Sequence, residues 1–488
     1  MPKTSYSTMH APTSFSQVKQ AIASGSTTLP EQVRTYLRNI EDQAQLNVFL
    51  EVYADEAIAE AERIQEKMNQ GTAGRLAGMV LGIKDVLCHK DHGLQAGSKI
   101  LHGFKSQFTA SAVQRLLNED AIIIGRQNCD EFAMGSSNEN SAFGPVRNAA
   151  DPSRVPGGSS GGSAVAVQAG MCTASLGTDT GGSVRQPAAF CGVIGLKPTY
   201  ARISRYGLAA YASSFDCIGP ITNTVEDAAL LLEIMAGDDG QDSTVSRKPV
   251  PEYSKFIQDK AKAAEPKKIG YLRQGLESES IAPAIRAAMQ RSIDLLKEAG
   301  HSVEPVDFPF IDYILPTYYI LTMAEASSNL SRYDGVRYGY RSPHTTDLLS
   351  MYKKSRSEGF GKEVQKRIML GTFVLSANYY DAYFTKAQRV RRLIQQQTEQ
   401  MLNKFEFILM PAAPTTAFKI GEKTTDPIAM FLGDVFTVQA NVAGVPSIAL
   451  PTGKDESGLP IGLQVMSKNF SEAELLAFAQ HFMSLGSN

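Results

Sequence analysis

Apolar residues recur along this chain at two different spacings, and the change between them predicts alternating helices and strands. Residues 31–40 and 51–69 carry apolar side chains three and four positions apart, which predicts two amphipathic helices. Short continuous apolar runs at 79–83 and 121–124 predict buried strands, and a helical pattern around Leu116 lies between them. Such alternation predicts α/β layers that share one core.

A polar segment at 238–266 interrupts this pattern and is predicted to form an exposed connection. The alternation then resumes. A strand is expected at 269–272, a helix at 284–299, and further strands at 303–306 and 407–410. The second half of the chain therefore has the same α/β character as the first.

Composition narrows the class of protein. The chain has 488 residues, of which 43% are hydrophobic and 20% charged, as in ordinary globular proteins. Its 48 basic and 50 acidic side chains give a net charge of −2, so no overall field attracts nucleic acid. It has no long apolar run for a membrane helix and no signal-peptide pattern, and its five cysteines are scattered. We therefore expect a cytoplasmic protein with free thiols, no membrane association and no major role in binding RNA directly.

The stretch from Pro156 to Pro187 carries the clearest chemical signal. Its two Gly-Gly-Ser turns place Ser159 and Ser183 in loops with little side-chain crowding. Glycines before Ser183 allow successive N–H groups to point at one spot, which is what an oxyanion requires. Gly/Ser-rich stretches are usually flexible linkers, but apolar segments flank this one. The pattern favours acyl transfer, with Ser183 as the nucleophile.

A serine nucleophile needs a base, and histidine is the usual one. None of the seven histidines lies in a glycine-rich or strand-end context, and the chain has neither H-E-x-x-H nor C-x-x-C, so no metal site is predicted. Lys84 instead ends the apolar run at 79–83. Burial lowers the pKa of a lysine and so allows it to accept a proton near neutral pH. Lys84 is the predicted base.

These motifs together resemble the amidase signature family. They are Lys84 in GIKDV, GGSSGG at 157–162, and DTGGSVRQPAAFCGVIGLKPT at 179–199. By that resemblance Lys84 is the base, Ser159 is held by a cis peptide and relays the proton, and Ser183 attacks a carboxamide. The backbone N–H groups implied for the oxyanion hole, besides that of Ser183, are those of Thr180, Gly181 and Gly182.

The resemblance also implies the fold. We expect one α/β amidase-signature domain over residues 1–488, with a central mixed β-sheet and helices on both faces. Its expected parts are a helical N-terminal part (1–75), the signature core with the triad (76–237) and a second α/β portion that completes the substrate pocket (267–488). The later portion is therefore predicted to fold back over the two serines.

Within the family, the chain is most similar to the A-subunit branch of the bacterial glutamyl-tRNA(Gln)/aspartyl-tRNA(Asn) amidotransferases. The similar segments are 130–148, 154–164, 196–208, 333–341 and 361–373. This branch implies a glutaminase that supplies ammonia within a heterotrimer. A B subunit would use ATP and Mg²⁺ to activate Glu-tRNA(Gln) or Asp-tRNA(Asn), a small C subunit would bridge the two, and this chain would hold no cofactor.

The same branch implies residues that bind glutamine. Arg367 matches a clamp for the α-carboxylate, Asp434 matches a partner for the α-ammonium, and Tyr318 is a third contact for which Tyr319 competes. A bidentate guanidinium suits a carboxylate better than a lysine does. Two alternatives stay open at this point: a free-standing amidase that hydrolyses small carboxamides, and a catalytically inactive scaffold of a tRNA-modifying assembly.

Overall fold

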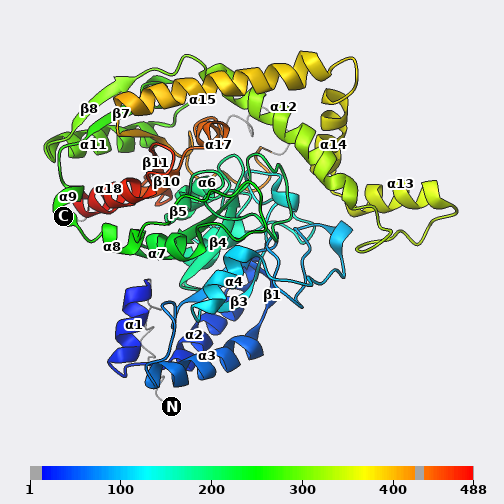
Figure 1. Ribbon diagram of the computed structural model, residues 1–488, viewed down its shortest axis with the longest axis horizontal. Coiled ribbons are helices and arrows are strands. Elements are labelled where there is room, and N and C mark those ends of the chain that lie inside the picture. The colour runs from blue at the N-terminus through cyan, green and yellow to red at the C-terminus, as the bar shows by residue number, and fades with distance from the viewer. Residues whose placement is uncertain (1–13, 424–432, 487–488) are drawn as a thin grey trace.

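A single mixed β-sheet runs through the protein (Figure 1). The computed structural model describes residues 14–423 and 433–486, and within them the sheet has eleven strands in the order β1-β3-β2-β4-β6-β5-β10-β11-β9-β7-β8. The β2–β3, β2–β4, β7–β8 and β7–β9 pairs are parallel, and the other pairs are antiparallel. The strands span Phe49–Val52 (β1), Val80–Lys84 (β2), Ile122–Gln127 (β3), Ala174–Asp179 (β4), Ile194–Lys197 (β5), Cys217–Thr222 (β6), Lys268–Leu272 (β7), Ser302–Val306 (β8), Phe407–Pro411 (β9), Ser447–Lys454 (β10) and Pro460–Met466 (β11).

Helices surround the sheet, and the long α12 and α15 lie together on one side of the molecule (Figure 1). The helices span Phe15–Ala23 (α1), Leu29–Asp42 (α2), Ala54–Asn69 (α3), Ser111–Asn118 (α4), Gly161–Gln168 (α5), Arg185–Cys191 (α6), Val225–Met235 (α7), Tyr253–Phe256 (α8), Lys260–Ala263 (α9), Gln274–Glu277 (α10), Pro283–Glu298 (α11), Ile311–Asn329 (α12), Leu348–Gly359 (α13), Lys362–Val374 (α14), Lys386–Lys404 (α15), Val438–Ala443 (α17) and Glu472–Leu485 (α18). Short 3₁₀ turns are Ala44–Leu46 (η1), Lys99–Leu101 (η2), Glu131–Ala133 (η3) and Leu330–Arg332 (η4), and Asp381–Thr385 (η5) is a π-helical turn.

Both faces of the sheet are buried. Alternate side chains of a strand point to opposite faces, so neighbouring residues of one strand belong to different hydrophobic clusters. Leu81 and Ile83 of β2 join one hydrophobic cluster, whereas Val80 joins another. Likewise Ile123 of β3 lies in the first cluster and Ile122 in the second. Strands buried on both faces read as continuous apolar runs, which is the pattern found at 79–83 and 121–124. The predicted mixed sheet with helices on both faces is confirmed.

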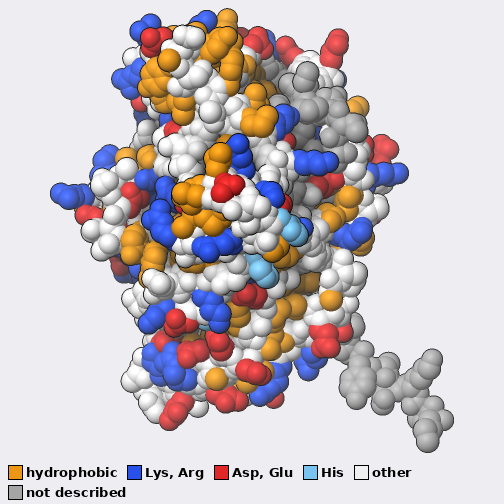
Figure 2. Space-filling model, turned by 90° about the vertical axis from the view of Figure 1, so that its right-hand side faces the viewer, with side chains coloured by type: hydrophobic (Ala, Val, Ile, Leu, Met, Phe, Trp, Pro, Cys, Tyr) orange, Lys and Arg blue, Asp and Glu red, His pale blue; other side chains and the backbone are white. Residues whose placement is uncertain are grey.

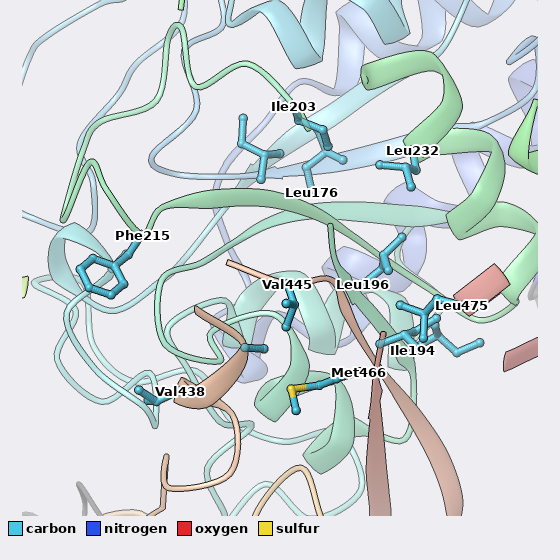
Figure 3. Close-up of a cluster of buried hydrophobic side chains, with 14 of the residues drawn as sticks. Leu176, Ile194, Leu196, Ile203, Phe215, Leu232, Val438, Val445, Met466 and Leu475 are labelled. Atoms are coloured by element: carbon cyan, nitrogen blue, oxygen red, sulfur yellow. The ribbon is translucent and has the colours of Figure 1, made fainter. Parts of the chain in front are cut away.

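The core continues from the first half of the chain into the second. In the cluster drawn in Figure 3, Leu176 of β4 and Ile194 and Leu196 of β5 are buried together with Met466 of β11 and Leu475 of α18. β5 also pairs with β10 in the sheet. Strands on both sides of the 238–266 segment thus share one sheet and one core.

Two expectations need correction. The helix expected at 51–69 begins only at Ala54, because Phe49–Val52 pair with β3 as the edge strand β1. The connection at 238–266 is not wholly exposed, since it contains α8 and the buried ring of Tyr253, whose hydroxyl accepts a hydrogen bond from Arg202 Nε at 2.8 Å. The edge strand β1 was missed because it is only four residues long. The buried Tyr253 was missed because the residues around it in the connection are mostly polar.

The surface carries charges of both signs. On the face shown in Figure 2, which is the side of α13 and α14 in Figure 1, Lys and Arg side chains alternate with Asp and Glu and surround hydrophobic patches. No helix in the described part of the chain is both long enough and apolar enough to cross a membrane.

Candidate active site

Lys84 lies at the carboxyl end of β2, between two parallel neighbours, β3 and β4. Ligand sites of α/β proteins form at this edge of a sheet. The side chain is fully buried, and its Nζ lies 2.7 Å from Ser159 Oγ, 2.8 Å from Ser160 Oγ and 2.9 Å from Thr178 Oγ1. Burial lowers the pKa of Lys84 to about 8, against the opposing pull of buried groups such as Asp130. A lysine in this state exchanges a proton with a hydroxyl near neutral pH.

Ser159 is held in a rigid turn in front of α5. The peptide bond between Gly158 and Ser159 is cis. The Ser159 carbonyl accepts a hydrogen bond from the Asp130 N–H at 3.2 Å, and a Cβ on Gly158 would lie 2.2 Å from the Asp130 carboxylate, so only glycine fits there. The neighbouring Ser160 N–H donates to the carbonyl of Ser183 at 3.2 Å. The two serine turns that the sequence pointed to are therefore joined through their backbones.

Ser183 lies in the tight turn between β4 and α6. Asp179, the last residue of β4, fixes this turn by accepting hydrogen bonds from Arg185 and from the backbone N–H of Gly182. Burial alone would raise the pKa of Asp179, but the adjacent Arg185 guanidinium lowers it to about 2. Gly182 has φ +124°, and a Cβ there would lie 2.2 Å from Thr437 Oγ1, so the turn needs glycine.

The donors predicted for an oxyanion differ in their engagement. The Gly182 N–H already donates to Asp179 Oδ1 at 2.9 Å. Among the described residues, the N–H groups of Thr180, Gly181 and Ser183 donate to no other group. The Gly181 backbone also faces the Tyr318 hydroxyl, which would lie 2.5 Å from a Cβ at that position. This arrangement leaves three N–H groups for an oxyanion and commits the fourth to holding the turn.

A small pocket opens beside Ser183 and draws residues from both halves of the chain. It is lined by Ala133, Gly135, Ser136, Gly181, Ser183, Tyr318, Tyr319, Arg367 and Asp434. Four residues of the later portion, Tyr318, Tyr319, Arg367 and Asp434, thus lie beside Ser183. Tyr318 and Tyr319, the two alternatives for the third contact, both line the pocket. Tyr318 faces Gly181, and Tyr319 faces Asp434.

Arg367 supplies the positive charge of the pocket. It lies on α14 and is buried, with Nε donating to Glu363 Oε1 at 2.8 Å and Nη1 donating to the Tyr211 hydroxyl at 2.9 Å. A buried guanidinium held in this way is oriented before any ligand arrives, which favours bidentate binding of a carboxylate.

Asp434 supplies the negative charge. Its Oδ2 accepts hydrogen bonds from Ser136 Oγ at 2.7 Å and from the Tyr319 hydroxyl at 3.1 Å. Burial raises the pKa of Asp434 to about 6, although these two hydrogen bonds oppose the shift. A cation and an anion beside a serine suit a zwitterionic substrate, namely an α-amino acid with a reactive side chain.

Several supporting residues of the site were not predicted from the sequence. Ser160 and Thr178 share Lys84 Nζ with Ser159, Ser136 holds Asp434, and Glu363 holds Arg367. Two of these could have been found: Ser160 is the second serine of GGSSGG, and Glu363 precedes Arg367 by one helical turn. Ser136 and Thr178 carry no local signal, because only the tertiary fold brings them to their partners.

Comparison with known proteins agrees with this geometry. The sequence profile of the amidase family, described as Amidase, matches residues 31–476. The chain is 50% identical over 461 residues to the A subunit of glutamyl-tRNA(Gln) amidotransferase from Koribacter versatilis, covering 94% of this chain and 95% of the relative. It is 48% identical over 467 residues to the protein of the same name from Chlorobium phaeobacteroides, covering 96% and 98%.

Two solved structures have the same fold. The A subunit of glutamyl-tRNA(Gln) amidotransferase from Thermotoga maritima matches with a TM-score of 0.75 at 38% identity, covering 92% of this chain and 90% of that one. Native peptide amidase from Stenotrophomonas maltophilia matches with a TM-score of 0.83 at 28% identity, covering 98% and 97%. With a family profile that spans most of its length and relatives that are half identical to it, this chain belongs to the amidase family.

Proposed function

We propose that this chain is the glutamine-hydrolysing subunit of a tRNA-dependent amidotransferase. The observation that carries the proposal is the pocket in which Arg367 and Asp434 lie beside Ser183. Arg367 would bind the α-carboxylate of glutamine and Asp434 its α-ammonium, which leaves the side-chain carboxamide for Ser183. The high identity to relatives named as A subunits of glutamyl-tRNA(Gln) amidotransferase supports this assignment over other amidase activities.

The proposed reaction is an acyl transfer in two steps. Ser183 Oγ attacks the carboxamide carbon of glutamine while its proton passes through Ser159 to neutral Lys84. The oxyanion is stabilised by N–H groups of the turn before Ser183. The proton then returns from Lys84 through Ser159 to the amide nitrogen, the carbon–nitrogen bond breaks, and ammonia leaves. Water hydrolyses the glutamyl–Ser183 ester to glutamate, and the serine is regenerated.

In this proposal the ammonia is used by a partner. A B subunit would use ATP and Mg²⁺ to activate Glu-tRNA(Gln) or Asp-tRNA(Asn), a C subunit would complete the heterotrimer, and tRNA would be reached mainly through the B subunit. This chain's part is to bind glutamine, hold the ester and release ammonia.

The test is ammonia release from glutamine, measured for the chain alone and then with co-expressed B and C subunits. We expect the rate to rise when partners, ATP and misacylated tRNA are present, with Gln-tRNA(Gln) or Asn-tRNA(Asn) as product. Rapid hydrolysis of simple or peptide amides by the chain alone, in preference to glutamine, would instead assign it to free-standing amidases such as the peptide amidase that it resembles in fold.

Binding of glutamine is expected to weaken in acid. Asp434 has a pKa of about 6 and must be ionised to bind an ammonium, so protonation below that pH removes the attraction. We expect KM for glutamine to rise about tenfold for each pH unit below 6. The control is Asp434→Asn, which should have a high KM with no such pH dependence. An unchanged KM for the native chain between pH 7 and 5 would exclude Asp434 as the ammonium site.

A further inference from the structure

We propose that an exposed surface on α14 and the following turn is the docking site for a protein partner whose own apolar surface is bordered by acidic side chains. This aromatic face consists of Met369, Leu370, Phe373, Tyr379 and Tyr383. The inference rests on the proposed function only in so far as that function requires a partner. The face itself is defined by exposure, ring contacts and charge.

The aromatic face is unusually apolar for a surface. Met369 is 70% exposed, and Phe373, Tyr379 and Tyr383 are each at least 40% exposed. The three aromatic rings form one group: the ring centroids of Phe373 and Tyr379 are 4.3 Å apart, and those of Phe373 and Tyr383 are 5.9 Å apart. Single exposed apolar residues are normal, but a contiguous group of this kind marks a contact surface. Aromatic residues and methionine are also the types enriched at protein interfaces.

The fold explains why these residues point outward. α14 packs on α12 so closely that a Cβ on Gly371 would lie 1.9 Å from the carbonyl oxygen of Met323. Val364 and Val374 are buried on this inner side. Phe373 follows Met369 by four residues and Leu370 by three, so its side chain shares the outer side of the helix with both. The helix therefore has two apolar faces, and the described part of the chain covers only one of them.

Charge around the aromatic face indicates what covers it. The exposed basic residues on α14 and α15 are Lys362, Lys386, Arg389, Arg392 and Lys404, whereas the exposed acids are Glu399 on α15 and Asp381 in the turn between the two helices. A local excess of base on a chain whose net charge is −2 attracts an acidic surface. A second copy of this chain would bring the same bases face to face, and such like-charge contact is unfavourable. Figure 2 shows the side of α13 and α14, where hydrophobic and basic side chains lie next to each other.

RNA fits this surface less well than a protein does. Phosphates would pair with the bases, but they would leave Met369 and Leu370 in contact with water or with a charged backbone. A protein surface satisfies both the aliphatic and the basic groups. The place of the face also suits a partner that receives ammonia, because Arg367 lies on the same helix, two residues before Met369, with its side chain in the pocket.

The experiment measures binding of the full chain to the purified B–C pair by calorimetry. Phe373→Glu and Met369→Glu each remove an apolar contact and add a charge that repels an acidic partner. We expect either substitution to raise Kd at least about tenfold, as truncation of an interface anchor does. The matched control is Phe108→Glu, because Phe108 is 41% exposed, close to the 45% of Phe373. Phe108 lies in a loop in the first half of the chain, far from α14 in the sequence. It should bind with native affinity.

Several outcomes decide the proposal. Thermal unfolding and hydrolysis of glutamine by each variant alone should match the native chain, which separates loss of docking from loss of folding or of the active site. Native binding by both Phe373→Glu and Met369→Glu would overturn the proposal. So would a native dimer that Phe373→Glu disperses, or loss of tRNA binding with B–C binding intact. Because binding is read without turnover, the docking result stands even if the chain proves not to hydrolyse glutamine.

Discussion

Replacement of Ser183 by alanine is expected to lower glutamine hydrolysis by at least about 10⁴-fold, because the reaction then has no nucleophile. The Ser183 turn is rigid, since Asp179 holds Gly182 and Arg185, so the alanine variant should keep the shape of the pocket. Glutamine should still bind, because Arg367 and Asp434 are untouched. The measurement is ammonia release at saturating glutamine, together with glutamine affinity by calorimetry.

The control for Ser183→Ala is Ser137→Ala. Ser137 follows Ser136, which lines the pocket, and its side chain is buried. Its Oγ nevertheless has no hydrogen-bond partner within residues 14–423 and 433–486. Ser137→Ala should therefore keep native activity. A second control uses the assembled complex, in which added ammonia should still support transamidation by Ser183→Ala. Residual glutaminase activity above about 1% of native would show that Ser183 is not the nucleophile.

The triad positions could be predicted from the sequence because each has a local signature. Lys84 ends an apolar run, and Ser159 and Ser183 lie in glycine-rich turns, which makes them candidates, whereas the relay role of Ser159 comes only from the resemblance to the amidase signature family. The structure brings Lys84 within 2.7 Å of Ser159 and places Ser183 at the pocket. Buried strands were predictable for the same reason, since strands covered on both faces are apolar throughout.

Other parts of the site have no local signature. Arg367 lies in a segment rich in lysine and arginine, and the local sequence does not indicate that its side chain is buried between Glu363 and Tyr211. Thr178 and Ser136 are similarly ordinary until the sheet and the later portion come together. The engagement of the Gly182 N–H by Asp179 is likewise a result of the turn's geometry. Contacts across long separations in the chain must be observed, because no short pattern encodes them.

Removal of the Lys84 amine is expected to have the second largest effect. Lys84→Met keeps the length of the side chain but cannot accept a proton from Ser159, and we expect kcat/KM for glutamine to fall at least about 10³-fold. In the native chain kcat/KM should rise with pH up to an apparent pKa of about 8, because only the neutral amine is a base. Lys84→Met should lose this dependence. Measurement of kcat/KM from pH 6 to 9.5 tests both expectations.

Stability separates the catalytic role of Lys84 from a structural one. Burial lowers its pKa from 10.5 to about 8, so between these values the folded protein binds fewer protons than the unfolded chain. The lysine's contribution to the free energy of unfolding therefore rises with pH over that window and is lowest at and below pH 8. At pH 7 the buried ammonium is disfavoured by about 3 kcal/mol, which offsets its three hydrogen bonds to hydroxyls. Lys84→Met should thus be inactive at pH 7 while its Tm is not below that of the native chain. If activity and Tm fall together, the lysine would be holding the fold, and another group would have to serve as the base.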